Sequence, residues 1–186
     1  MLFELVLYIT PHNNYNTHTR NSQQTRIKLL FQEVKIMSIL FINSSPNPHG
    51  NTAKVAAALL EGKEYETLNL AEYKIYGYGQ QFPDDQFFEV IDKIRAAKTI
   101  VIGSPLYWHN LSGLLRCFLD RTYGPFEQGE FSGRDMYAVI QGAAPEKWML
   151  EACEYTLSRF AGICGFDYKG MVTNRQEAEK KSKEVK

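Results

Sequence analysis

Small polar side chains cluster between an apolar run and an alanine-rich stretch, in the segment ILFINSSPNPHGNT at residues 39–52. We interpret the apolar run as a buried strand and the alanine-rich stretch as the start of a helix. Hydroxyl groups and free backbone N–H groups at a helix start attract anions, because the helix dipole is positive there. The segment therefore predicts an anion site suited to phosphate. It lacks the Gly-Lys-Ser/Thr and Gly-x-Gly-x-x-Gly patterns, and by itself it is also compatible with an ordinary strand-to-helix turn.

Two large aromatic residues, Tyr107 and Trp108, follow another apolar run, in the segment GSPLYWHNLS at residues 103–112. Aromatic side chains at the exit of a buried strand are costly to expose unless they contact something flat or apolar. The segment therefore predicts a stacking surface for an aromatic ring, and the alternative is that these side chains only cover the edge of the sheet. His109 invites a role as proton donor, but we interpret it as a partly exposed loop residue.

A third segment, Gln141-Gly142-Ala143-Ala144, consists mainly of small residues that follow an apolar run. Small residues let the backbone approach a ligand closely. A phosphate cradle, an aromatic surface and a small backbone loop together match the phosphate, the ring and the ring edge of flavin mononucleotide (FMN).

The elements that must position these segments alternate regularly from Met37 onward. Strands are expected at residues 39–42, 65–70, 99–103, 135–141 and 166–173, helices at 51–62, 85–97, 110–122 and 145–161, and a short, fraying helix in the charged tail 174–186. Phe88, Ile91 and Ile94 are expected to point inward, and Asn110 to cap its helix. This alternation predicts an α/β fold with a parallel sheet covered on both faces. Ligands bind beyond the carboxyl ends of such strands, so residues 43–50, 104–110 and 141–145 should line one crevice.

Composition excludes several classes of function. The 186 residues carry a formal net charge of zero, which argues against a broad nucleic-acid footprint and against the strong acidity of a small electron carrier. No apolar run is long enough to span a membrane. The three cysteines form no C-x-x-C pair and no metal-ligand spacing, so we expect reduced thiols in a cytoplasmic protein, most of them small core residues.

Residues 1–36 do not continue the alternating pattern. Residues 2–9 are apolar but contain Glu4, and residues 11–24 form a polar tract rich in Asn, Thr and Gln. We interpret residues 1–36 as an N-terminal extension outside the core fold, with Met37 as the functional start and residues 37–186 as the FMN-binding domain. The expectation is that deletion of the extension leaves folding and cofactor content intact.

The chain resembles the flavodoxin-like NADPH-dependent FMN reductase family of NAD(P)H oxidoreductases. The phosphate motif of that family, Gly-Ser-x-Arg-x-x-Gly-Asn-Thr, stands here as SSPNPHGNT at residues 44–52. Its second motif, Gly-Ser-Pro-x-Tyr-Trp/Phe-x-Asn-x-Ser followed by Phe-x-Asp-Arg, stands as GSPLYWHNLS at 103–112 and FLDR at 118–121. The resemblance covers residues 37–173 and implies a three-layer, doubly wound, five-stranded parallel sheet of strand order 2-1-3-4-5.

The resemblance also implies which residues hold FMN. Those at the phosphate are Ser44, Ser45, Asn47, His49, Asn51 and Thr52; those at the ring are Pro105, Leu106, Tyr107, Trp108 and Asn110; those at the pyrimidine edge are Gln141, Gly142 and Ala143. Ser44 replaces the usual glycine. Asn47 replaces the usual arginine, which removes a positive charge and predicts weaker FMN binding, with His49 as a candidate donor in the gap.

The activity implied by the resemblance is hydride transfer from NADPH or NADH through FMN to a small-molecule acceptor, such as a quinone, a flavin, an azo or nitro compound, or a metal ion. No protein side chain is expected to act as a catalytic acid or base, since the cofactor carries the chemistry. The resemblance also implies a homodimer, while the net charge and the lack of a long apolar run predict no nucleic-acid or membrane partner. The alternatives are a flavodoxin-type electron carrier and a flavodoxin-like regulatory module without a cofactor.

Overall fold

The computed structural model describes residues 37–186, so the expectations for the N-terminal extension lie outside the described residues. In chain order the elements are β1 Met37–Asn43, α2 Asn51–Leu59, β2 Glu66–Asn69, η1 Leu70–Glu72, α3 Phe87–Ala96, β3 Ala97–Tyr107, β4 Asn110–Leu111, α4 Gly113–Arg121, β5 Asp135–Gln141, α5 Lys147–Cys164, β6 Asp167–Val172, α6 Arg175–Lys181 and η2 Ser182–Glu184. None of the described helices is long and apolar enough to cross a lipid bilayer.

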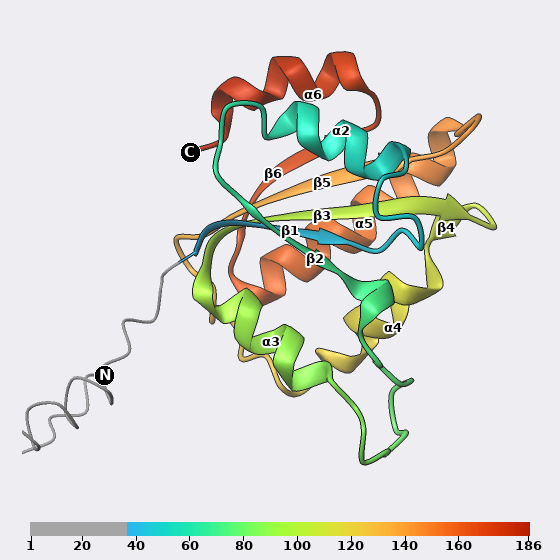
Figure 1. Cartoon of the computed structure of the whole chain (residues 1–186), viewed down its shortest axis with the longest axis vertical. Helices are drawn as coiled ribbons and strands as arrows, with labels where there is room; N and C mark the ends of the chain where they lie inside the picture. The colour runs from blue at the N-terminus through green and yellow to red at the C-terminus, as the bar shows by residue number, and fades with distance from the viewer. Residues whose placement is uncertain (1–36) are drawn as a thin grey trace, which may run out of the picture. The chain divides into compact units, whose positions relative to one another are not determined.

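Five parallel strands form the central sheet in the order β2-β1-β3-β5-β6 (Figure 1). This arrangement confirms the predicted α/β fold and its strand order, once the two-residue β4 is set aside. Strand β4 is absent from the sequence prediction; it pairs antiparallel with the end of β3, where Leu106 lies opposite Leu111.

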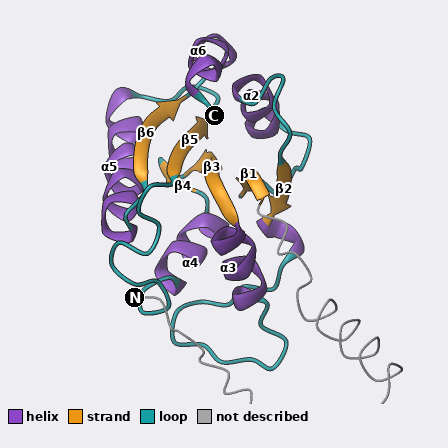
Figure 2. Ribbon diagram, turned by 90° about the vertical axis from the view of Figure 1, so that its left-hand side faces the viewer, coloured by secondary structure: helices purple, strands orange, loops and turns teal. Residues whose placement is uncertain are grey.

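Helices cover both faces of the sheet, α2 and α6 on one face and α3, α4 and α5 on the other (Figure 2). The alternation of side chains along the strands explains the two layers. In β1, Ile39 and Phe41 pack toward α2, whereas Leu40 and Ile42 pack toward α3. Nearly continuous apolar strands are what a parallel sheet buried on both faces requires.

Helix α3 buries a different face from the one expected. Phe88 was expected to point inward, but 61% of it is exposed, whereas Phe87 and Val90 are fully buried. The buried positions 87, 90, 91 and 94 follow the spacing of one helical face, and Phe88 lies outside it. The prediction that Ile91 and Ile94 face the core is confirmed.

Helix α4 begins later than expected, because Asn110 belongs to β4 and pairs with Tyr107. Ser112 is the residue that caps the helix, accepting a hydrogen bond from the backbone N–H of Leu115. The prediction that Asn110 caps this helix is therefore wrong.

The C-terminal tail is helical, as expected, but it packs against the core instead of fraying. Ala178 in α6 and Val185 beyond η2 are buried beside α2. The hydroxyl of the buried Tyr137 in β5 donates a 3.1 Å hydrogen bond to the carbonyl of Glu184. The tail therefore completes the layer that covers this face of the sheet.

Candidate functional site

The three segments singled out in the sequence lie at one edge of the sheet, where the parallel strands end. Asn43 at the end of β1 is in register with Gly103 in β3, and Pro105 further along β3 is in register with Gln141 at the end of β5. The loops that follow β1 and β5 and the hairpin that ends β3 therefore leave the sheet side by side (Figure 1). This edge is the candidate site.

A chain of buried serine residues connects two of these segments. The Ser112 hydroxyl donates to the Ser44 hydroxyl at 2.8 Å, and the Ser112 backbone N–H donates to the Ser104 hydroxyl at 2.9 Å. Both the hydroxyl and the backbone N–H of Ser44 donate to the carbonyl of Gly103. Buried hydroxyl groups are costly unless they are hydrogen-bonded, so this connected set fixes the relative positions of β1, β3 and the start of α4.

Two glycines allow the segments to approach closely. A Cβ atom on Gly103 would lie 2.7 Å from the Phe41 ring and 2.9 Å from the Thr52 methyl group, so a larger residue here would push α2 away. A Cβ atom on Gly142 would lie 3.0 Å from Leu106, which places the loop after β5 directly against the β3–β4 hairpin. The close approach at Gly103 requires glycine, whereas a side chain at position 142 would need a small shift of Leu106.

The loop between β1 and α2 is held by its own side chains. The Asn43 side-chain oxygen Oδ1 accepts from Ser45 N–H at 3.1 Å, the Ser45 hydroxyl from Asn47 N–H at 3.2 Å, and the Asn47 side-chain oxygen Oδ1 from His49 N–H at 3.0 Å. Each side chain thus bonds the backbone two residues ahead. These three consecutive turns give the loop a defined shape.

Helix α2 begins without a capping side chain. Its N-cap is Gly50, and its first turn holds no acidic residue that would neutralise the helix dipole. The first N–H groups of a helix have no partner within the helix, so those of Asn51 and Thr52 remain available to an anion. Asn47 and His49 are exposed beside them.

The β3–β4 hairpin presents its aromatic side chains to solvent on a strained turn. Trp108 and His109 form the two-residue turn, with positive φ values of 48° and 65°. Such a turn is normally occupied by glycine, asparagine or aspartate, and each other residue in this conformation costs about 1–3 kcal/mol. Trp108 is 96% exposed and Tyr107 48% exposed. Strained, exposed aromatic residues at the end of a buried strand are typical of a binding surface.

Trp148, in the first turn of α5, is half exposed and contacts the hairpin. Its ring meets the His109 ring edge-on with 5.3 Å between centroids, and its indole N–H donates to the Glu146 carboxylate at 2.9 Å. His109 is exposed, in agreement with its interpretation as a loop residue. In the sequence, the one signal that Trp148 lies near the site is its position shortly after the Gly142 loop.

The remaining predicted site residues lie around the same edge at different depths. Buried are Ser44, Ser45 and Thr52; half-buried are Pro105, Leu106, Gln141 and Gly142; exposed are Asn47, His49, Asn51, Tyr107, Trp108, Asn110 and Ala143. Ser44 differs from the others, because its hydroxyl and its N–H both donate to the Gly103 carbonyl.

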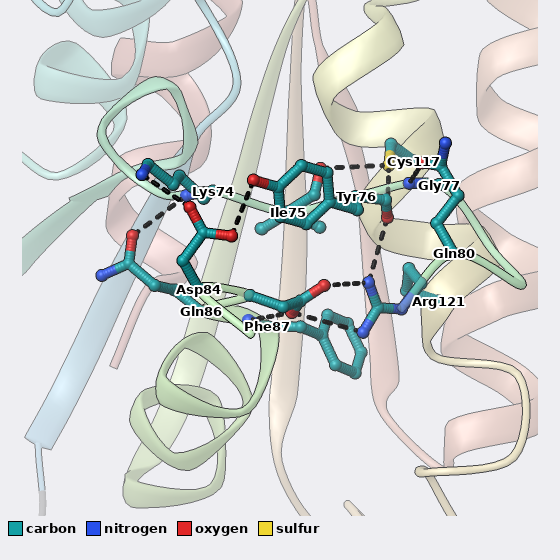
Figure 3. A network of polar contacts seen from close by, with 11 residues as sticks. Lys74, Ile75, Tyr76, Gly77, Gln80, Asp84, Gln86, Phe87, Cys117 and Arg121 are labelled. Atoms are coloured by element: carbon teal, nitrogen blue, oxygen red, sulfur yellow. Dashed lines mark hydrogen bonds and ion pairs between the residues drawn. The ribbon is translucent and has the colours of Figure 1, made fainter. Parts of the chain in front are cut away.

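A second polar network joins the segment before α3 to α4 (Figure 3). The Arg121 guanidinium donates to the Asp85 carboxylate at 2.6 Å and to the Tyr76 carbonyl at 3.1 Å, and it lies 4.5 Å from the Phe87 ring centroid. Both charged side chains are only 14% exposed. Arg121 therefore anchors residues 76–87 to α4. Asp120, its neighbour in sequence, forms an exposed ion pair with Arg116.

The cysteines behave as core residues in the part of the chain that the structure describes. Cys153 and Cys164 are buried in α5, and burial raises the pKa of each thiol to about 11. Cys117 is half-buried in α4, where its thiol lies 3.1 Å from the Tyr76 carbonyl and burial raises its pKa. No group of metal-ligating side chains is found among residues 37–186.

Comparison with known proteins gives a consistent picture. A family model described as NADPH-dependent FMN reductase matches residues 37–166. An iron-sulfur flavoprotein of Archaeoglobus fulgidus is 31% identical over 99 residues, covering 46% of this chain and 49% of that protein. The Bacillus subtilis protein YwqN, whose name describes an NAD(P)H-dependent FMN-containing oxidoreductase, is 29% identical over 93 residues, covering 46% and 51%. The matched segments thus span about half the length of these curated relatives.

Solved structures share the fold at low sequence identity. The Trp repressor binding protein of Bacillus subtilis superposes with a TM-score of 0.62 at 21% identity, covering 80% of this chain and 99% of that chain. An FMN-dependent NADH-azoreductase of Bacillus anthracis, solved with FMN, superposes with a TM-score of 0.58 at 19% identity, covering 80% and 95%. At this level of identity the likeness establishes the fold.

Proposed function

Because the chain belongs to the NADPH-dependent FMN reductase family, we propose that it is an FMN-dependent NAD(P)H oxidoreductase acting on a small-molecule acceptor. The observation that carries the proposal is the convergence of three different surfaces at one sheet edge: an uncapped helix start, an exposed aromatic hairpin and a close-packed glycine loop. The acceptor that we propose is a quinone, a flavin, an azo or nitro compound, or a metal ion.

The residues at this edge fit FMN. The free N–H groups at the start of α2 and the nearby side chains of Ser45, Asn47 and Thr52 offer donors to a phosphate dianion. No cation from the loop itself is needed, since backbone donors at a helix start carry phosphate in many proteins. Ser44 acts as a positioning residue in this proposal, because its donors already hold Gly103.

The ring of FMN has a matching surface on the hairpin. Tyr107 and Trp108 provide exposed aromatic faces, with Pro105 and Leu106 as half-buried apolar neighbours. Asn110 at the base of the turn is an exposed polar neighbour. The backbone N–H groups of Gly142 and Ala143, with the Gln141 side chain, are candidate donors to the pyrimidine edge, where reduction places negative charge.

The chemistry that FMN supplies when bound is two-electron transfer: a hydride is taken from the dihydronicotinamide, and the electrons then pass to the acceptor. The protein contributes binding, orientation of the two rings and stabilisation of charge at the ring edge. No side chain of the site needs to act as an acid or base in this scheme. We further propose a cytoplasmic homodimer.

Two relatives are named iron–sulfur flavoproteins. An iron–sulfur cluster is nevertheless not part of this proposal. Clusters of this kind are held by four cysteine thiolates, or by cysteine together with histidine. This sequence has three cysteines, of which two are buried in α5. Both belong to the apolar core, and the described residues 37–186 contain no group of side chains that could hold a metal ion.

An absorption spectrum with added FMN, followed by anaerobic addition of NADPH or NADH, tests the proposed function. We expect the bound flavin band to bleach and to return when a quinone is added. Binding without bleaching would instead indicate a flavodoxin-type electron carrier. A protein that fails to take up FMN would be a regulatory module that shares only the fold.

A further inference from the structure

A cleft of about 530 Å³ lies between α2 and α6 and opens beside the candidate FMN site. The two helices run side by side over the same face of the sheet (Figures 1 and 2). Asn51 at the start of α2 and Gln141 at the end of β5 line this cleft, and both also belong to the candidate FMN site. A ligand in the cleft would therefore be a direct neighbour of bound FMN.

The lining of the cleft combines an apolar wall with polar and cationic groups. Val55, Ala57 and Ala58 form a smooth wall of small side chains along α2. Lys54 and Arg175 add positive charge, and Glu61 adds a carboxylate. Arg175 is 79% exposed and also forms a 2.6 Å ion pair with Glu179, which a phosphate in the cleft would compete with. The carboxamides of Asn51 and Gln141 make no side-chain hydrogen bond to another of residues 37–186 and are free to pair with a ligand. The Asn174 carboxamide is occupied, since it caps α6.

These groups match the chemistry of an adenosine phosphate. A purine ring is flat and apolar on its faces, and its edge carries donors and acceptors that carboxamides pair with. Lys54 and Arg175 supply charge for phosphate, and a carboxylate such as Glu61 can accept from the ribose 3′-hydroxyl, which is free in both NADH and NADPH. The volume lies within the range of about 300–1,000 Å³ that is usual for ligand sites.

We propose that the cleft between α2 and α6 binds the adenosine-phosphate half of the nicotinamide dinucleotide. The inference rests on the proposed function, and it assigns a site for the donor that lies apart from the aromatic hairpin. In this arrangement the hairpin orients the reacting rings, and the cleft supplies affinity for the part of the donor that does not react.

A second cleft, of about 460 Å³, lies on the other side of α2 and is the less suitable site. Lys54 and His49 line it together with Tyr65, but it does not reach Gln141 or the loop after β5. A dinucleotide bound there would have to cross the loop before α2 to reach the hairpin. Arg175 lines only the first of these two clefts and so distinguishes them.

The test compares two charge reversals with matched controls. Arg175→Glu changes a cation of the cleft, and Arg159→Glu makes the same charge change on the exposed surface of α5. Lys54→Glu has Lys93→Glu on α3 as its control. Each variant is loaded with saturating FMN, and flavin reduction is followed with NADPH, with NADH and with reduced nicotinamide mononucleotide, which lacks the adenosine half. Calorimetric titration with 2′,5′-ADP measures binding without any turnover.

We expect both cleft variants to raise the KM for NADPH about tenfold, the equivalent of 1.4 kcal/mol, and to weaken 2′,5′-ADP binding by a similar factor. Their reduction by the mononucleotide should match that of the wild type, and both controls should behave as the wild type throughout. Unchanged KM and 2′,5′-ADP binding in Arg175→Glu would overturn the inference, whether or not Lys54→Glu has an effect. If neither NADPH nor the mononucleotide bleaches bound FMN in the wild type, the proposed function itself is wrong.

Discussion

The Ser112 hydroxyl donates a 2.8 Å hydrogen bond to the Ser44 hydroxyl, although the two residues are 68 positions apart in the chain. The same Ser112 oxygen caps α4 by accepting from the Leu115 N–H. One buried oxygen thus joins the loop after β1 to the helix that follows the aromatic hairpin. The relative position of the proposed phosphate and ring sites depends on this contact.

Replacing Ser112 by alanine should therefore affect both stability and cofactor binding. The change removes a helix cap and leaves buried polar partners unpaired, which together should lower the free energy of unfolding by about 2 kcal/mol. FMN affinity should fall as well, because the two halves of the site lose their connection. Urea denaturation and FMN titration measure the two effects. Ser158→Ala, which removes a hydroxyl bonded only within α5, is the control and should change neither quantity appreciably.

The strained hairpin turn should gain stability when glycine replaces its residues. Trp108→Gly relieves a left-handed backbone conformation and should raise the free energy of unfolding by about 1 kcal/mol, while it weakens FMN binding through loss of the exposed ring. His109→Gly should be stabilising with a much smaller effect on FMN. Thermal unfolding and FMN titration separate the two outcomes. A Trp108→Gly protein that binds FMN as tightly as the wild type would remove the hairpin from the proposed site.

Loss of the Arg121–Asp85 pair should be costly, because both side chains are only 14% exposed. Arg121→Met leaves the Asp85 carboxylate without its partner and should lower the free energy of unfolding by about 2–3 kcal/mol. Arg116→Met, which breaks the exposed pair with Asp120, should cost less than 1 kcal/mol. Equal effects of the two substitutions in urea denaturation would contradict the structural role assigned to Arg121.

The same pair predicts a dependence of stability on pH. Hydrogen bonding to Arg121 lowers the pKa of Asp85 below its ordinary value of 3.8. The stabilisation is therefore fully present above the unfolded-state pKa and is lost as the pH falls through the folded-state pKa. The stability difference between the wild type and Asp85→Asn should be constant above pH 5 and should shrink below pH 4. Denaturant midpoints measured across this range provide the check.

Removal of the last five residues should destabilise the fold even though they lie far from the chain's predicted motifs. Truncation after Lys181 deletes the Glu184 carbonyl that pairs with Tyr137 and the buried Val185 side chain. We expect a loss of about 2–3 kcal/mol from an unpaired buried hydroxyl and lost apolar burial. Lys186→Ala is the control, because that side chain is exposed. An unchanged midpoint in urea would show that the tail does not contribute to the core.

Much of the fold was predictable because its signals are local. Each of the five strands was predicted from its own stretch of the sequence, and β5 has the predicted bounds. Chain order then fixes a parallel sheet, and the rule for ligand position directs attention to the edge where the three segments meet. The exposure of Tyr107 and Trp108 agrees with the prediction that these residues are available for stacking.

The features that the sequence did not predict depend on contacts between residues far apart in the chain, or on which face of a helix is buried. Phe87 and Phe88 are identical in character, and only packing against the sheet decides which of them is buried. The hairpin of Trp108 and His109 has none of the usual turn residues, so no local signal predicts it. The contacts of Arg121 with Asp85, and of Ser112 with Ser44, join residues that are distant in sequence.

The loop before α2, our proposed phosphate site, lacks an arginine but has a defined shape. Asn43, Ser45 and Asn47 already hold the backbone in its folded shape, so an incoming anion has little chain to immobilise. Ordering a flexible loop normally opposes ligand binding through loss of conformational entropy. Here the loop is already ordered when the protein folds. Association with FMN should consequently be fast and free of a slow isomerisation phase, and the missing cation should show itself mainly as faster release.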